Sequence, residues 1–104
     1  MSEYRYELTP SAVRDLESIA EYVSIQLGAK ESAIALLNEI EAAIVAACRF
    51  PESAPPVADE LLARKGYRKL IVKNYIAFYI PDHEAQKISV MRVMYFARDY
   101  LREL

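Results

Sequence analysis

The sequence predicts an α+β fold in which a strand and a helix hairpin precede a three-stranded antiparallel meander. Apolar residues recur at helical spacing in the first half of the chain, which indicates the hairpin. The second half is rich in aromatic and β-branched residues, as strands are, and a proline-containing stretch separates the halves. With 104 residues we expect a single domain over 1–104, its helices packed on one face of one sheet.

The first predicted element is a strand over Tyr4–Leu8, where aromatic or apolar residues alternate with charged ones. Thr9 and Pro10 then predict a helix start, because a threonine side chain accepts from a free helix N–H and proline suits the first turn. Gly28 is placed to end this helix. Its core-facing stripe consists of Val13, Leu16, Ile19, Ala20, Val23 and Leu27.

A second helix is predicted over Lys30–Cys48, and the short link between the two helices favours an antiparallel hairpin. The stretch Phe50–Gly66 contains three prolines that exclude a continuing helix, so we interpret it as a connecting loop with room for a short helical turn over 58–65. The stripe of the second helix consists of Ile34, Leu37, Ile40 or Glu41, Ile44 and Cys48.

The rest of the chain predicts strands joined by short turns. Lys73–Asn74 is a candidate two-residue turn because asparagine tolerates a positive φ, and Pro81–Glu84 is the second candidate turn. A short final helix is predicted over 98–104. The strands of the meander are predicted over Tyr67–Val72, Tyr75–Ile80 and Lys87–Tyr95.

Several classes of protein are excluded or disfavoured by composition. The chain has one cysteine, one histidine and two glycines, which disfavours an intrachain disulfide, a Cys/His zinc site and a glycine-rich phosphate loop. We expect no cofactor and no metal. Cys48 falls on a core stripe as an inert thiol, and His83 falls in a turn as a solvated residue. No apolar run is long enough to cross a bilayer and the start lacks a signal-peptide pattern, so we expect a cytoplasmic protein.

Charge is divided unevenly along the chain. Residues 1–61 carry four basic and eleven acidic side chains, whereas residues 62–104 carry nine basic and four acidic ones. This division predicts a basic surface for an anionic partner, unless the charges only decorate solvated faces. The cations proposed for target or anion binding are Arg64, Lys65, Arg68, Lys69, Lys73, Arg92 and Arg98.

Tyrosines are interleaved with these cations and could stack on bases or pack against a partner. Tyr75 and Tyr79 share a strand face with Ala77, which favours a core role for both. Arg92 is different, because it lies within the apolar run 88–94. A buried guanidinium there needs an acidic partner or a functional role, unless the strand lies at an edge.

The order of elements and three segments resemble the RelE/ParE toxin superfamily. The segments are "YRYELTPSAVRDLESIAEYV", "YRKLIVKNYIAFYIPD" and "RVMYFARDYLREL", and the resemblance covers nearly the whole chain. The resemblance implies the toxin of a type II toxin–antitoxin system, which inhibits growth, contributes to plasmid stabilization and is neutralised by a cognate antitoxin.

The superfamily includes RelE-like ribonucleases, which cut messenger RNA on the ribosome, and ParE-like inhibitors of DNA gyrase. The ribonucleases use lysines and arginines of the central strands with a tyrosine near the C-terminus. Arg68 and Leu70 stand at two strand lysine positions, and Ile76 replaces an arginine after Tyr75. If the chain is a ribonuclease, the resemblance implies a catalytic set drawn from Arg68, Lys69, Arg92, Tyr95 and Arg98, with Tyr100 as a second candidate tyrosine.

Because that set is incomplete and "RVMYFARDY" is closer to the ParE-like pattern, we favour a toxin that binds a protein target such as DNA gyrase. The alternatives are a ribonuclease acting on the ribosome and messenger RNA, and a non-toxic member that only binds its antitoxin.

Overall fold

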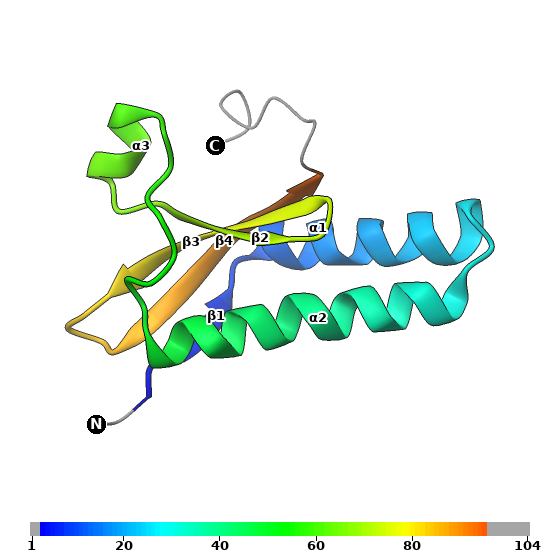
Figure 1. Ribbon diagram of the computed structural model, residues 1–104, viewed down its shortest axis with the longest axis horizontal. Coiled ribbons are helices and arrows are strands. Elements are labelled where there is room, and N and C mark those ends of the chain that lie inside the picture. Colours follow the sequence, from blue (N-terminus) through cyan, green and yellow to red (C-terminus); the bar gives the residue numbers. More distant parts are fainter. Residues whose placement is uncertain (1–2, 96–104) are drawn as a thin grey trace.

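The computed structural model describes residues 3–95 and contains the predicted succession of strand, helix hairpin and meander (Figure 1). The helix predicted over 98–104 lies outside the described residues, as does Arg98. In chain order the elements are β1 (Arg5–Leu8), α1 (Pro10–Glu21), the π-helical turn η1 (Tyr22–Gln26), α2 (Lys30–Arg49), α3 (Glu60–Arg64), β2 (Arg68–Val72), β3 (Tyr75–Asp82) and β4 (Lys87–Tyr95).

The four strands form one mixed sheet in the order β1-β4-β3-β2. β2, β3 and β4 pair antiparallel as the predicted meander, whereas β1 pairs with β4 in parallel. The pairing of β1 ends where Leu8 lies opposite Val90, and within residues 3–95 no strand continues along that edge of β4. In the described part of the chain, no helix is both long and apolar enough to cross a membrane.

Thr9 joins the end of β1 to the start of α1, as the sequence predicted. Its Oγ1 accepts from the backbone N–H of Ala12 at 3.1 Å and donates to the carbonyl oxygen of Met91 at 2.8 Å. Because one hydroxyl both caps the helix and bonds to β4, α1 begins directly beside the open edge of that strand.

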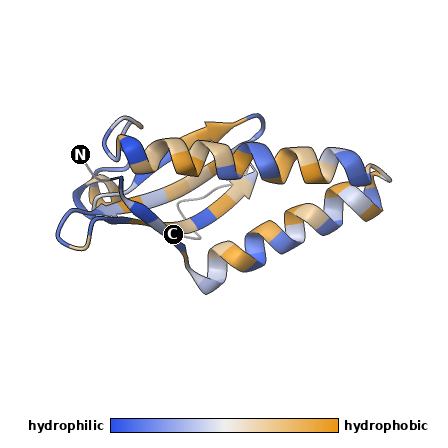
Figure 2. Cartoon of the chain, turned by 90° about the horizontal axis from the view of Figure 1, so that it is seen from below, coloured by the Kyte–Doolittle hydropathy of each residue, from blue (hydrophilic) through white to orange (hydrophobic). Residues whose placement is uncertain are grey.

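The hairpin covers one face of the sheet (Figure 2). Its core-facing side differs from the predicted stripes. Ala12, Ala33 and Leu36 are buried there, whereas Val13 and Ile34 are exposed. Hydrophobic periodicity favoured the larger residues. The structure places the two alanines inward, because a small side chain lets a helix backbone approach its neighbours closely.

The first helix also ends differently from the prediction. The α-helical pattern stops at Glu21 and continues as the π-helical turn η1, in which the backbone N–H of Leu27 bonds to the carbonyl oxygen of Tyr22 at 3.2 Å. Gly28 follows with φ +61°, so the helix ends at the predicted glycine. The wider turn leaves Leu27 exposed, although the periodicity placed it in the core.

A second, smaller core lies on the opposite face of the sheet. The stretch 50–66, predicted as a loop with room for one short helix, contains α3, whose first turn is capped by Asp59. The backbone of Pro55–Val57 also bonds to Tyr67 and Lys69 along the outer edge of β2. This core, which we call the second-face cluster, consists of Val57, Leu62, Tyr67, Ile76, Phe78 and Met94.

Both predicted turns exist, with differences in detail. Lys73–Asn74 joins β2 to β3, but the positive φ of 54° belongs to Lys73 rather than to Asn74. The second turn starts later than predicted, because β3 extends through Asp82. The Oδ1 of Asp82 accepts from the backbone N–H groups of Glu84 and Ala85 at 3.1 Å each, which fixes the turn.

Tyr79 and Ala77 are buried against the hairpin as predicted. The Tyr79 hydroxyl donates to the carbonyl oxygen of Pro51 at 2.7 Å, and burial raises the pKa of this hydroxyl above its ordinary 10.0. A raised folded-state pKa gives stabilisation that is complete below pH 10 and is lost as pH rises through the folded value.

We therefore expect Tyr79→Phe to weaken the dependence of stability on pH above 10. At neutral pH the variant loses one hydrogen bond, worth about 1 kcal/mol. Urea unfolding at pH 8 and pH 11 measures both effects, and Tyr22→Phe is the control because Tyr22 is exposed. If the free energy of unfolding fell equally between pH 8 and pH 11 in the wild type and in Tyr79→Phe, the role assigned to this hydroxyl would be contradicted.

Candidate functional site

Arg92 is held by Asp15 of α1. The Arg92 Nε donates to Oδ2 of Asp15 at 2.7 Å, and Nη2 donates to Oδ1 at 3.0 Å. The same carboxylate accepts from the backbone N–H of Val93 at 3.0 Å. Asp15 therefore neutralises the guanidinium and occupies a donor on the open edge of β4, where β1 has ended. Asp15 is therefore the acidic partner that the apolar surroundings of Arg92 in the sequence require.

The sequence patterns did not single out Asp15 as the partner of Arg92. Its position offered a signal, because it precedes Ile19 by four residues and therefore borders the apolar stripe. An acid at such a border can reach the sheet beneath the helix.

Arg68 also bonds within the chain. Its Nη1 donates to the carbonyl oxygens of Glu52 at 3.0 Å and Ala54 at 2.6 Å. Arg68 therefore ties the stretch after α2 to β2, on the face where Val72 meets the hairpin. Lys69 alternates to the other face, where its strand partner is Phe78 of the second-face cluster. Two neighbouring candidate cations thus lie on opposite faces of the sheet.

Three described cations of the meander pair with acids of the hairpin or of β1. Besides Arg92 with Asp15, Lys73 lies 3.3 Å from Glu39 and Lys87 lies 3.0 Å from Glu7. The uneven charge distribution therefore serves in part to join the sheet to the hairpin and to β1. The more exposed of these pairs each contribute at most about 1 kcal/mol.

The structure does not gather the described candidate cations on one surface. Arg64 pairs with Glu60 on α3 at 3.1 Å, and Lys65 is exposed directly after that helix. Together with Lys69 they belong to the side of the sheet that carries the second-face cluster. Arg68 lies on the hairpin side, whereas Arg92 lies opposite Phe78 in the pairing of β3 with β4 and is therefore on the second face, although its guanidinium pairs with Asp15 of α1.

Three tyrosines line a groove between the helix hairpin and the end of the meander. A cavity of about 620 Å³ lies between α1 and the end of the meander, and its lining includes Tyr22, Leu27, Tyr75 and Tyr95. The Tyr75 and Tyr95 rings meet edge to face with centroids 5.7 Å apart, and burial raises the pKa of Tyr75. Such a half-exposed aromatic wall suits packing against a protein partner.

Among the candidate ribonuclease residues in the described part of the chain, Lys69 and Arg92 flank Phe78 on the second face, whereas Arg68 lies on the other face. Arg68 and Arg92 make the internal contacts given above, and Lys69 is on the opposite face from Arg68. Leu70 packs against the hairpin core and Ile76 is buried in the second-face cluster, so both positions where the superfamily's ribonucleases carry cations are apolar and internal here.

Cys48 is buried as predicted, and burial raises the pKa of its thiol. His83 is exposed in its turn as predicted, but it has two neighbours that the sequence did not indicate. Its Nδ1 lies 2.7 Å from the Tyr4 hydroxyl, and its Nε2 lies 3.1 Å from Oε1 of Glu52. These contacts join the second turn of the meander to the N-terminus and to the stretch after α2.

Comparison with known proteins identifies the fold. The family of the ParE toxin of the type II toxin–antitoxin system parDE matches residues 6–100. The chromosomal ParDE system from P. aeruginosa superposes with a TM-score of 0.71 at 17% identity, covering 89% of this chain and 96% of that one. The toxin–antitoxin complex RelBE2 from Mycobacterium tuberculosis superposes with a TM-score of 0.62 at 21% identity, covering 90% and 99%. No curated protein sequence matches the chain.

A mixed four-stranded sheet with a helix hairpin on one face and a match to this family define a toxin of the RelE/ParE superfamily, as the resemblance predicted. Within it, the chain belongs to the ParE toxin family of type II toxin–antitoxin systems.

Proposed function

We propose that this toxin acts by binding a protein, DNA gyrase being the first candidate, and that a cognate antitoxin neutralises it in the cytoplasm. Growth inhibition, and plasmid stabilization where the gene pair lies on a plasmid, would follow from that activity. The observation that carries the proposal is the internal use of Arg68 and Arg92. The Arg68 guanidinium bonds to backbone carbonyls and the Arg92 guanidinium pairs with Asp15, which favours a role in holding the fold over the phosphate binding that ribonuclease chemistry requires.

The antitoxin part of the proposal is supported by family membership and by the two similar structures, a ParDE toxin–antitoxin system and a RelBE2 toxin–antitoxin complex. Among the target-binding candidates we favour Arg64, Lys65 and Lys69. They share the side of the sheet opposite the hairpin, near the exposed apolar side chains of Leu61 and Ile71. A mixed apolar and cationic surface is suited to a protein partner.

Purified toxin tested in a gyrase supercoiling assay provides the direct experiment, with induced expression in cells as the measure of toxicity. We expect growth arrest and loss of supercoiling. Lys69→Glu should weaken inhibition about 10-fold, because reversing a half-exposed charge at an interface slows association. Lys30→Glu, on α2, is the matched control and should leave inhibition unchanged.

Three results would contradict this proposal. Unaffected gyrase at large toxin excess would reject the target. New 5′ ends on translated messages after induction, detected by primer extension, would identify a ribonuclease instead. Unaffected growth would identify a non-toxic family member.

A further inference from the structure

Tyr4, His83 and Glu52 form a chain of hydrogen bonds in which the imidazole stands between a phenol and a carboxylate. The Tyr4 hydroxyl lies 2.7 Å from Nδ1 of His83, and Nε2 of the same ring lies 3.1 Å from Oε1 of Glu52. A neutral imidazole has one N–H donor and one acceptor nitrogen, and a carboxylate at neutral pH only accepts. Nε2 therefore carries the proton, and the lone pair of Nδ1 faces the Tyr4 hydroxyl.

Backbone contacts fix the three segments that carry this chain of hydrogen bonds. The N–H of Tyr4 donates at 2.9 Å to a carbonyl oxygen at the end of α2. The carbonyl oxygen of Glu52 accepts from Nη1 of Arg68 at 3.0 Å. The turn that contains His83 is closed by the Asp82 carboxylate. Figure 1 shows the three segments at the same end of the molecule, so the fold places the hydroxyl, the imidazole and the carboxylate together.

An open cavity gives access to the Tyr4 hydroxyl. It has a volume of about 1000 Å³, and all three side chains of the hydrogen-bonded chain line it. Phe50, which is 66% exposed, adds an apolar wall. Glu3 and Glu52 also line the cavity, and Arg49 is paired with Glu3 at 3.1 Å. Because two carboxylates repel negative charge, this lining suits a neutral compound with an apolar part better than an anion.

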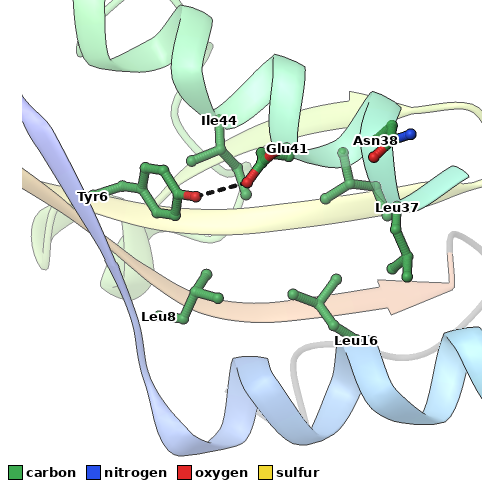
Figure 3. Close-up of a pocket in the computed structure, with 8 residues that line it drawn as sticks. Tyr6, Leu8, Leu16, Leu37, Asn38, Glu41 and Ile44 are labelled. Atoms are coloured by element: carbon green, nitrogen blue, oxygen red, sulfur yellow. Dashed lines mark hydrogen bonds between the residues drawn. The ribbon is translucent and has the colours of Figure 1, made fainter. Parts of the chain in front are cut away.

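Tyr6 provides a contrast within the same protein. Its hydroxyl donates directly to Oε2 of Glu41 at 3.0 Å (Figure 3). This hydrogen bond, followed by burial, raises the pKa of Tyr6, which disfavours its phenolate. A carboxylate is a weak general base at neutral pH, whereas an imidazole titrates close to it. Of these two tyrosines, Tyr4 is therefore the one whose neighbour can take its proton.

We propose that Tyr4 is a base-assisted nucleophile and a site of covalent modification by neutral, activated acyl compounds. The phenolic oxygen attacks the acyl carbon while its proton passes to Nδ1 of His83. The bond to the leaving group then breaks, and the leaving group takes the electron pair and the proton from Nδ1. The products are an acyl ester of Tyr4, the protonated leaving group and a neutral imidazole.

Glu52 is a positioning residue in this step. It accepts from Nε2–H throughout, which holds the ring in the required tautomer and stabilises the imidazolium that forms between attack and release. A hydroxyl within reach of a base that is itself oriented by a third group is the arrangement of an activated nucleophile. The site is separate from the cations assigned above to the target, so the proposal holds whichever target the toxin has.

Acetylation of the full chain with N-acetylimidazole, a neutral acyl donor, tests the proposal. Mass spectrometry of the digested protein gives the rate at each tyrosine, and hydroxylamine removes acetyl groups from tyrosine but not from lysine. Tyr22 is the internal comparison, because it is 52% exposed whereas Tyr4 is half-buried. Access to solvent alone would make Tyr22 the faster of the two. We expect Tyr4 to react about 10-fold faster than Tyr22, as a positioned general base accelerates proton removal, and Tyr6 to react most slowly.

Variants separate base assistance from local environment. His83→Gln should lower the rate at Tyr4 about 10-fold, because an amide can bond to the phenol but cannot take its proton. Glu52→Gln should also slow Tyr4, and the ring nitrogen resonances of His83 should show the Nδ1–H tautomer gaining population. Glu84→Gln, in the same turn, is the matched control and should change neither the rate nor the tautomer.

The comparison of Tyr4 with Tyr22 in the wild type needs no substitution, and amide spectra report whether each variant is folded. A wild-type rate at Tyr4 no higher than that at Tyr22 would overturn the proposal. The same holds for an unchanged Tyr4 rate in folded His83→Gln, or for a wild-type His83 ring that carries its proton on Nδ1.

Discussion

Asp15→Asn is expected to lower the free energy of unfolding by about 3 kcal/mol, the range for removing one partner of a buried ion pair. The side chains of Arg92 and Asp15 are only 21% and 13% exposed, so water replaces the lost partner poorly. An asparagine oxygen can still accept one hydrogen bond, but its amide places donors against the guanidinium. The N–H of Val93 then competes for the single remaining acceptor.

Urea unfolding at neutral pH measures this loss, and Glu17→Gln on the exposed side of the same helix should change stability by less than about 0.5 kcal/mol. The combined variant Asp15→Leu with Arg92→Met tests the cause. Replacing both partners should cost clearly less than Asp15→Asn, because no charge is left unpaired. A loss below about 0.5 kcal/mol for Asp15→Asn would mean that water already solvates Arg92.

The Asp15–Arg92 pair was only partly predictable from the sequence. The apolar run around Arg92 indicated that the arginine needed a partner, but the partner is 77 residues earlier in the chain. No local pattern joins the two positions. The parallel pairing of β1 covers only half of β4 and leaves the edge where Asp15 bonds, which again depends on residues far apart in the chain.

The order of elements was predictable because each depends on local signals. Thr9 caps the first helix, Gly28 ends it with a positive φ, and the Lys73–Asn74 turn falls where two strand patterns stop. The buried side of each helix was less predictable. Ala12 is buried and Ile34 is exposed, which is the reverse of what their hydrophobicity indicated. Small side chains at close approaches carry little periodic signal, and only the assembled core shows which helix side is covered.

The candidate site was predicted in part. The sequence supplied the cations and tyrosines, but it could not show that Arg68 bonds to the carbonyls of Glu52 and Ala54, or that Lys73 pairs with Glu39. The residue type fixes the charge of a side chain. Whether that side chain is free to bind a target depends on which acidic groups and backbone carbonyls the fold places next to it. The resemblance to the toxin superfamily supplied the function that individual residues did not.

Phe78→Ala is expected to have the largest effect on stability, lowering the free energy of unfolding by about 4 kcal/mol. Phe78 is fully buried in the second-face cluster, and removing its ring leaves a cavity among the described residues of that cluster. The loss should also release α3, because Leu62 is the buried residue through which that short helix packs on the sheet.

Two measurements test this expectation. Denaturant unfolding gives the total loss, with Phe50→Ala as the matched control: Phe50 is 66% exposed and its removal should change stability by less than about 0.5 kcal/mol. Hydrogen exchange of the Ala63 and Tyr67 amides, which bond to Asp59 and Leu62, reports whether α3 has come away. If Phe78→Ala costs less than about 1 kcal/mol and these amides stay protected, α3 is held by its connections alone and the second face has no core of its own.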